Sequence, residues 1–196
     1  MTSLPAQTLF TPEEYITQER KARHKSEYLN GQILAMSGAS RAHSLITSNI
    51  SNRLYNQLME SDCEVHSSDM RVQPSQKAYF YPDVVVACNE PRFADDVFDT
   101  LLNPVVIVEV LSPSTATYDR EEKFSHYKQL ASLQDYILVS QHKFCVEHYC
   151  RQDRNWQHTE LRSPEDVLIL DSIECEIPLR DIYMRVIVTE SRGENQ

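Results

Sequence analysis

Pro104-Val105-Val106-Ile107-Val108-Glu109-Val110-Leu111 is the stretch of this 196-residue chain that most strongly indicates its fold. Its run of Val and Ile is typical of a strand buried on both faces of a sheet. A single charged residue, Glu109, interrupts the run. The stretch is far shorter than the roughly 20 apolar residues needed to cross a bilayer, so we expect no membrane partner.

Helices and further strands are predicted on both sides of this strand. Thr11-Pro12-Glu13-Glu14 is a helix start with a capping box, and Asn30-Gly31 predicts a tight turn in a hairpin over residues 27–37. Apolar residues recur at helical spacing over residues 40–60, and Asp119-Arg120-Glu121-Glu122 predicts the start of another helix. The remaining predicted elements are strands over 63–73, 78–88, 136–139 and 144–149, short strands after Trp156, and a helical turn over 178–183. This order predicts a mixed α/β domain, with a sheet flanked by helices.

Length and composition limit the organisation of the chain. We expect one domain over residues 11–189, with flexible ends over 1–10 and 190–196. The five cysteines are an odd number and include no C-x-x-C pair, so we expect free thiols rather than a disulfide framework. The N-terminus lacks a signal-peptide pattern, and together with free thiols this predicts a cytoplasmic location.

Charge and glycine content exclude several functional classes. The net charge of −10 and pI near 5.1 have the wrong sign for a dedicated nucleic-acid binder, and the acidic excess lies mainly after residue 60. The chain has only three glycines, too few for the glycine-rich loops that bind nucleotide phosphates. Neither the G-x-G-x-x-G motif nor the G-x-x-x-x-G-K-[ST] motif occurs.

Two carboxylates interrupt apolar strands, where an unpaired charge is costly. Asp83 follows Pro82 and precedes three valines, and Glu109 lies inside the strand quoted above. If the two strands are neighbours, the carboxylates converge and can hold Mg²⁺, which commonly takes one or two carboxylates and fills its other positions with water and phosphate oxygens. In the alternative interpretation, Asp83 caps a turn and Glu109 pairs with a buried Arg or Lys.

Three motifs resemble those of the Uma-type endonuclease family, formerly a domain of unknown function, within the PD-(D/E)XK, restriction-endonuclease-like superfamily. They are Tyr81-Pro82-Asp83-Val84-Val85-Val86, Pro104 to Thr115, and Asp119-Arg120-x-x-Lys123-Phe124-x-x-Tyr127. The similarity extends over roughly residues 10–190. It implies a restriction-endonuclease-like core with a central mixed sheet flanked by helices, and it implies that Asp83 and Glu109 bind the metal.

The resemblance also implies roles for three further residues. The superfamily pattern expects Lys two residues after Glu109, but the sequence has Leu111, so Lys123 is expected to supply the amine from the following helix and to assist the attacking water. Alternatively, Lys123 is a solvated helix residue that pairs with Asp119. Glu27 is a third acidic candidate, with a surface glutamate as the default interpretation. His43 is either a hydrogen-bonded core residue or a phosphate contact or proton carrier in the site.

Other clusters have simpler explanations. The basic residues Arg20, Lys21, Arg23 and Lys25 either contact a phosphate backbone or lie in solvent near a helix end, and the solvated interpretation is preferred. His142, Cys145, His148 and Cys150 contain soft metal ligands, but Cys145 and His148 face opposite sides of a strand, so ordinary packing is preferred. Ser112 and Ser114 lack the glycines of a nucleophile elbow.

The sequence therefore predicts a Mg²⁺-dependent endonuclease that hydrolyses DNA phosphodiester bonds, with Mn²⁺ as a substitute. We expect its DNA contact to be weak and salt-sensitive. A homodimer is expected if both strands are cut, because two active sites are then needed. One alternative is a catalytically degraded nucleic-acid or protein interaction module with the same fold. The other is a metal-dependent hydrolase of a different phosphate ester.

Overall fold

The structure is a computed structural model, and it describes residues 8–188. Its helices are α1 (Pro12–Glu19), α2 (Arg41–Leu58), α3 (Ala116–Tyr118), α4 (Phe124–Tyr127) and α5 (Leu179–Ile182), with a π-helical turn over Asp119–Lys123 and a 3₁₀ turn over Asp171–Ile173. Its strands are β1 (Ser26–Leu29), β2 (Gln32–Ala35), β3 (Glu64–Ser67), β4 (Arg71–Ser75), β5 (Ala78–Phe80), β6 (Val84–Ala87), β7 (Thr100–Leu101), β8 (Val106–Leu111), β9 (Asp135–Ser140), β10 (Val146–Gln152), β11 (Asn155–Leu161), β12 (Val167–Leu170) and β13 (Cys175–Pro178).

A six-stranded mixed sheet forms the centre of the molecule, in the order β11-β10-β9-β8-β6-β3. β8 and β9 run parallel, and the other neighbours are antiparallel. Every residue of β8 is buried, which confirms the prediction for the quoted stretch. The predicted mixed sheet with flanking helices is therefore confirmed.

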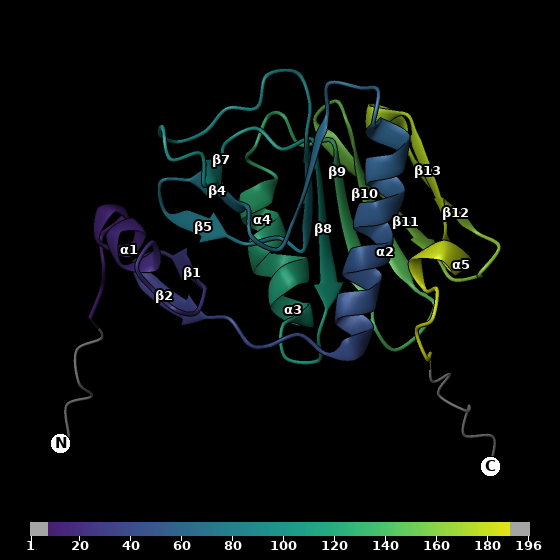
Figure 1. Ribbon diagram of the computed structural model, residues 1–196, viewed down its shortest axis with the longest axis horizontal. Coiled ribbons are helices and arrows are strands. Elements are labelled where there is room, and N and C mark those ends of the chain that lie inside the picture. Colours follow the sequence, from purple (N-terminus) through teal and green to yellow (C-terminus); the bar gives the residue numbers. More distant parts are fainter. Residues whose placement is uncertain (1–7, 189–196) are drawn as a thin grey trace, which may run out of the picture.

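A second sheet, in the order β2-β1-β5-β4-β7, lies beside the first (Figure 1). The predicted hairpin is confirmed, and Asn30 and Gly31 have the positive φ angles of 50° and 90° that its tight turn requires. The two long strands predicted over 63–73 and 78–88 were wrong in their extent. Each is divided into two shorter strands that belong to different sheets, because the chain crosses between the sheets twice.

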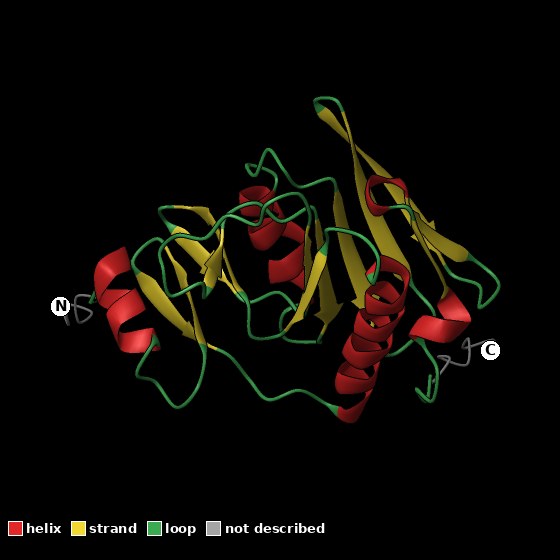
Figure 2. Ribbon diagram, turned by 45° about the horizontal axis from the view of Figure 1, so that its top comes forward, coloured by secondary structure: helices red, strands yellow, loops and turns green. Residues whose placement is uncertain are grey.

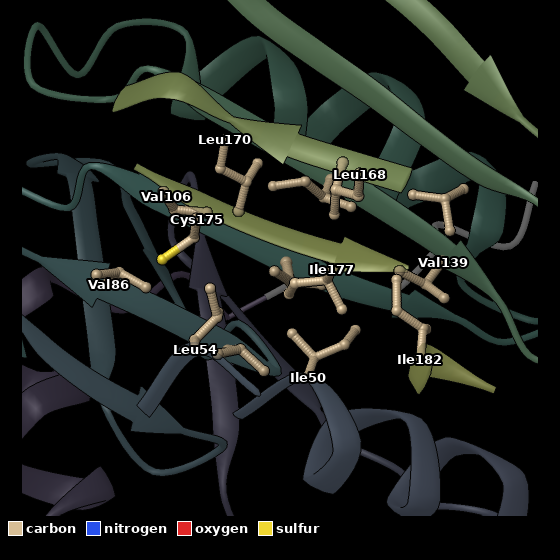
Figure 3. Packing of buried hydrophobic residues seen from close by; sticks show 14 of the residues in the cluster. Ile50, Leu54, Val86, Val106, Val139, Leu168, Leu170, Cys175, Ile177 and Ile182 are labelled. Atoms are coloured by element: carbon tan, nitrogen blue, oxygen red, sulfur yellow. The ribbon is translucent and has the colours of Figure 1, made fainter. Parts of the chain in front are cut away.

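Helix α2 covers one face of the six-stranded sheet, together with the β12–β13 hairpin and α5 (Figures 1 and 2). Ser40 caps α2, and its apolar stripe packs on alternate residues of β6, β8 and β9. Figure 3 shows Ile50 and Leu54 of α2 facing Leu168, Ile177 and their neighbours across this core.

The opposite face of the sheet is covered by α4 and the turn before it. Tyr127 packs on Phe80 of the second sheet, and both Phe124 and Tyr127 pack on Tyr136 of β9. Phe124 stacks on Tyr136 with 4.8 Å between ring centroids. This aromatic layer joins the two sheets, and Glu109 lies on the same face of β8 as Ile107 and Leu111 of this core.

The helix predicted to start at Asp119 starts earlier, at Ala116. Asp119 is not an N-cap but the first residue of the π-helical turn, and it is buried. The acidic residues that suggested a capping box are therefore inside a helical segment, and Asp119 has another partner, described below.

The prediction that all five cysteines are free thiols is wrong. Cys63 and Cys88 form a disulfide, while Cys145, Cys150 and Cys175 are free. The cause is strand register: β3 pairs with β6 so that Glu64 lies opposite Ala87, and the next pair outward is Cys63 and Cys88.

Of the chain ends, residues 1–7 and 189–196 lie outside the described residues, so flexibility is not tested there. Phe10 is held in place, since its amide donates to the Gly31 carbonyl at 2.8 Å and its own carbonyl accepts from the Tyr28 hydroxyl. No helix among the described residues combines the length and the hydrophobicity of a membrane span.

Candidate active site

Asp83 and Glu109 lie on neighbouring antiparallel strands. Val84 of β6 is opposite Val108 of β8, and extending that register by one residue places Asp83 opposite Glu109. The Val110 amide donates to Asp83 Oδ2 at 2.7 Å, which holds the Asp83 carboxylate at the edge of β8. The structure therefore brings together the two carboxylates that the sequence singled out.

Lys123 lies at the centre of a buried ionic cluster. Its Nζ atom is 3.1 Å from Glu109 Oε1, 2.9 Å from Glu27 Oε1 and 3.3 Å from Asp119 Oδ1. The Lys123 side chain is only 7% exposed. The expected i, i+4 pair with Asp119 exists, but the solvated interpretation of Lys123 is wrong. The alternative in which Glu109 pairs with a buried cation describes this contact.

Glu27 is buried, so its default interpretation as a surface glutamate is wrong. It lies on β1 of the second sheet, and its Oε1 accepts a hydrogen bond from the Tyr81 amide at 3.1 Å as well as contacting Lys123. The packing of the second sheet against α4 brings Glu27 to the Asp83–Glu109 pair across more than 50 residues of sequence.

His43 lies in the first turn of α2 and reaches Asp83 rather than only the apolar core. His43 Nε2 is 3.2 Å from Asp83 Oδ2, and the two side chains are 18% and 15% exposed. The more exposed side of the cluster is therefore formed by His43 and Asp83, while Glu27, Glu109 and Lys123 lie deeper.

Sequence reasoning did not assign Asp119 or Tyr127 to this site. Asp119 contacts Lys123 through the π-helical turn, and the Tyr127 hydroxyl donates to Glu109 Oε1 at 3.2 Å. The available signal was the spacing Asp119-x-x-x-Lys123-x-x-x-Tyr127, which places all three on one side of a helix. π-Helical turns occur frequently at functional sites.

Burial and neighbouring charges shift the pKa values of Glu109 and Lys123 in this cluster. Burial raises the pKa of the Glu109 carboxyl well above its ordinary value of 4.5; the Lys123 ammonium opposes this, and Asp119, Asp83 and Glu27 add to it. Burial disfavours the charged form of Lys123, but Glu109 and Glu27 overcome this effect and raise the pKa of its ammonium group well above 10.5. Lys123 therefore stays protonated among carboxylates that outnumber it.

The donor set fits a hard divalent cation. Three carboxylates contact the Lys123 ammonium group and a fourth, Asp83, acts on Glu109, so the negative charge of the cluster leaves room for a cation. The Tyr118 hydroxyl, which is buried and has no hydrogen-bond partner, lies on the turn before Lys123, whose Nζ is 5.7 Å from the Tyr118 ring. Carboxylate oxygens are the ligands that Mg²⁺ prefers. Among the described residues, no three of the cluster's carboxylates converge closely enough to enclose an ion, so Asp83 and Glu109 would leave most coordination positions to water or substrate.

Two hollows of the described surface lie away from the site. A hollow of about 400 Å³ lies beside Asp171 and Cys175, and one of about 280 Å³ lies beside α1. The carboxylate cluster lies mostly beneath the surface, and His43 and Asp83 are its more exposed side chains.

The other candidates are accounted for locally. Arg20 pairs with Asp95 and Asp99, and Lys25 pairs with Asp69, so these two basic side chains already have acidic partners. Ser112 contacts Ser114 and Thr115 in the turn after β8.

The sequence of the chain matches a known protein family. A family model described as "Uma2: Putative restriction endonuclease" matches residues 12–180. Two uncharacterized proteins of Synechocystis sp. are similar: sll1609 is 40% identical over 78% of this chain and 88% of that protein, and slr1290 is 42% identical over 88% of this chain and 90% of that protein.

A solved structure has the same fold. It is described as a "putative nuclease belonging to DUF820" from Anabaena variabilis, and it superposes with a TM-score of 0.74 over 91% of this chain and 99% of that one. Its sequence is 16% identical, so the likeness concerns the fold. The predicted restriction-endonuclease-like fold is therefore confirmed.

Proposed function

The chain belongs to the Uma2 restriction-endonuclease-like family, and on that premise we propose that it is a Mg²⁺-dependent endonuclease that hydrolyses DNA phosphodiester bonds. Asp83 and Glu109 hold the metal, with Mn²⁺ as a substitute. Lys123 assists the attacking water, and Glu27 and His43 complete the site.

One observation carries this proposal: the Lys123 ammonium group is buried against Glu109, on the strand next to Asp83. The expected lysine two residues after Glu109 is Leu111, which is buried among apolar side chains. Lys123 Nζ nevertheless reaches Glu109 from another element. The acid and amine groups needed for phosphodiester hydrolysis are thus present together despite the substitution in the motif.

Each side chain has a role that follows from its position. A bound Mg²⁺ would polarise the phosphodiester and lower the pKa of an attacking water. Lys123, kept protonated by its carboxylate neighbours, stabilises negative charge that builds on the phosphorus oxygens. Glu27 orients Lys123. His43, on the exposed edge, contacts the phosphate or carries a proton.

The test is plasmid cleavage with Mg²⁺ or Mn²⁺ by the wild-type chain and by Asp83→Asn, Glu109→Gln and Lys123→Gln. We expect the wild type to cut and each variant to lose at least about a hundredfold in rate, as is typical when one group that stabilises transition-state charge is removed. The matched control is Glu121→Gln, an exposed acid on the same helical segment, which should keep wild-type activity. Cleavage that persists in both carboxylate variants would rule out the assignment.

A degraded interaction module is the second candidate, and the loss of the motif lysine at Leu111 favours it. Calorimetric titration with Mn²⁺ separates the two. An endonuclease site binds the ion in a manner that depends on Asp83 and Glu109. If the wild type neither binds Mn²⁺ nor cuts DNA, the interaction module replaces our proposal.

The acidic composition shapes how the enzyme would contact DNA. With a net charge of −10, binding is expected to be weak and confined to a limited patch, and its affinity should fall as the salt concentration rises. Cutting both strands would require two sites and therefore a homodimer. Sedimentation with and without a short duplex, at two salt concentrations, tests both expectations.

A further inference from the structure

We propose that Asp135, His148 and Cys150 form a second metal site, suited to Zn²⁺, on the face of the sheet opposite the nuclease cluster. Asp135 begins β9, and His148 and Cys150 lie on β10. Their ligand atoms lie within 4.8 Å of one another.

Strand register brings these three side chains together. Cys150 is directly opposite Asp135 in the antiparallel β9–β10 pair, and His148 is two residues before Cys150 on the same face. Cys145 and His148 face opposite sides of β10, as the sequence indicated, whereas His148 and Cys150 share a face. Asp135 carries no local signal for this cluster, because its position beside Cys150 depends on the β9–β10 register.

The distances between the ligand atoms of these three side chains are close to those around a tetrahedral metal ion. Bonds of about 2.0–2.3 Å to nitrogen, oxygen and sulfur imply about 3.5 Å between ligand atoms. His148 Nε2 is 2.7 Å from Asp135 Oδ1, so these two atoms must separate by less than an ångström when an ion enters. No change of strand register is needed.

The ligand types select the metal. A thiolate and an imidazole favour Zn²⁺ over Mg²⁺, and one carboxylate completes a three-ligand set with a fourth position left for water. On binding, the Cys150 thiol loses its proton to solvent, and the His148 nitrogen that faces Asp135 must be unprotonated. The site thus differs in chemistry from the all-oxygen site proposed at Asp83 and Glu109.

The surroundings support a built site. Asp135 is 1% exposed, and its second oxygen accepts a hydrogen bond from the Ser172 hydroxyl in the 3₁₀ turn between β12 and β13. Such an outer contact fixes a ligating carboxylate.

This site lies apart from the nuclease cluster. Asp135, His148 and Cys150 share a face with Ile137, Val139 and Val146, which belong to the α2 core. Glu109 belongs to the other face. A metal here would join β9, β10 and the turn of the β12–β13 hairpin, and would act on stability rather than on cleavage.

The test is titration of the chain with Co²⁺, in the absence of reductant so that Cys63 and Cys88 stay bonded. We expect one Co²⁺ per chain with a thiolate-to-cobalt charge-transfer band, which Zn²⁺ abolishes by competition. Cys150→Ser should remove the band, and His148→Ala should weaken binding by at least about tenfold. His158→Ala is the control: His158 stacks on Tyr149 on the other face of the sheet, and its variant should bind as the wild type does.

A second measurement needs no variant. Zn²⁺ should protect Cys150 of the wild-type chain from alkylation, as seen by peptide mapping, while Cys145 and Cys175 show no change on adding the metal. Each of three results would overturn the proposal. They are the absence of the charge-transfer band in the wild type, a band that persists in Cys150→Ser, and alkylation of Cys150 that Zn²⁺ does not reduce.

Discussion

Lys123 is the residue on which the candidate site depends, because three carboxylates share its ammonium group in a buried position. Removing one partner of a buried ionic group leaves uncompensated charge and costs about 3–5 kcal/mol. We therefore expect Lys123→Gln to lower the free energy of unfolding at neutral pH by about this amount, measured by urea denaturation.

The matched control for this substitution is Lys77→Gln, since Lys77 is exposed. It should change stability by no more than about 0.5 kcal/mol. Mild acid should restore part of the stability of Lys123→Gln, because the carboxylates then become protonated. If Lys123→Gln is as stable as the control, the cluster is not the buried ionic centre described here.

Some residues of the candidate site were predictable from the sequence and others were not. Asp83 and Glu109 stand out because each breaks an apolar strand, and that signal is local. Glu27 and Asp119 carry no such signal: each reads as a surface acid until the second sheet packs on α4 and a π-helical turn directs Asp119 toward Lys123. Contacts of that kind depend on packing between distant segments, which a single sequence does not fix.

At the scale of elements, the β1–β2 hairpin gives a test of backbone geometry. Gly31 has φ of +90°, and an added Cβ would lie 3.1 Å from a Leu9 side-chain atom. Gly31→Ala should therefore cost more than about 1 kcal/mol, because Ala is strained at positive φ. Gly38→Ala is the control, since an added Cβ there meets nothing within 4 Å. Equal unfolding midpoints for the two variants would contradict this account of the turn.

The contact between α1 and the acidic segment before β7 gives a pH dependence. Hydrogen bonds from Arg20, together with the charge of Arg71, lower the pKa of Asp99 from 3.8 to about 2. A carboxylate with a lowered folded-state pKa stabilises the fold fully above its unfolded pKa and loses that contribution as the pH falls through the folded value. Stability should therefore decline between about pH 4 and about pH 2.

Asp99→Asn should reduce this part of the acid dependence. It should also cost about 1 kcal/mol at neutral pH, a figure discounted for the partial solvent exposure of Asp99. Thermal unfolding across the acid range measures both effects, with the exposed neighbour Asp96→Asn as the control. An unchanged acid slope in Asp99→Asn would show that other groups dominate it.

The elements themselves were largely predictable where their signals are local. The capping box at Thr11, the Asn30-Gly31 turn and the apolar periodicity of α2 each gave the observed element. The strands between residues 63 and 88 were less predictable. An extended segment that crosses from one sheet to another shows the same alternation of apolar and polar residues as one long strand.

At the scale of the whole molecule, the Cys63–Cys88 disulfide joins β3 to β6, the strand that leads from Asp83. Its sequence separation is 25 residues, and closing such a loop is worth about 3.5 kcal/mol in the chain-entropy model. We expect a reductant to lower the free energy of unfolding by about that amount. The double variant Cys63→Ser/Cys88→Ser should be insensitive to reductant.

Thiol titration of the unfolded chain checks the same assignment. Three free thiols are expected before reduction and five after it. Five thiols in the oxidised protein would contradict the disulfide. This bond was not predictable from an odd cysteine count, because it requires the β3–β6 register that places Cys63 opposite Cys88.

We propose that Asp83 and Glu109 share one catalytic metal beside Lys123. The most direct measurement is a crystal structure of the wild-type chain soaked with Mn²⁺, read from its anomalous density. We expect a peak bonded to oxygens of both Asp83 and Glu109, with the Lys123 ammonium group in the same cluster. Density that is absent there in a fully soaked crystal, or an ion that contacts neither carboxylate, would contradict it.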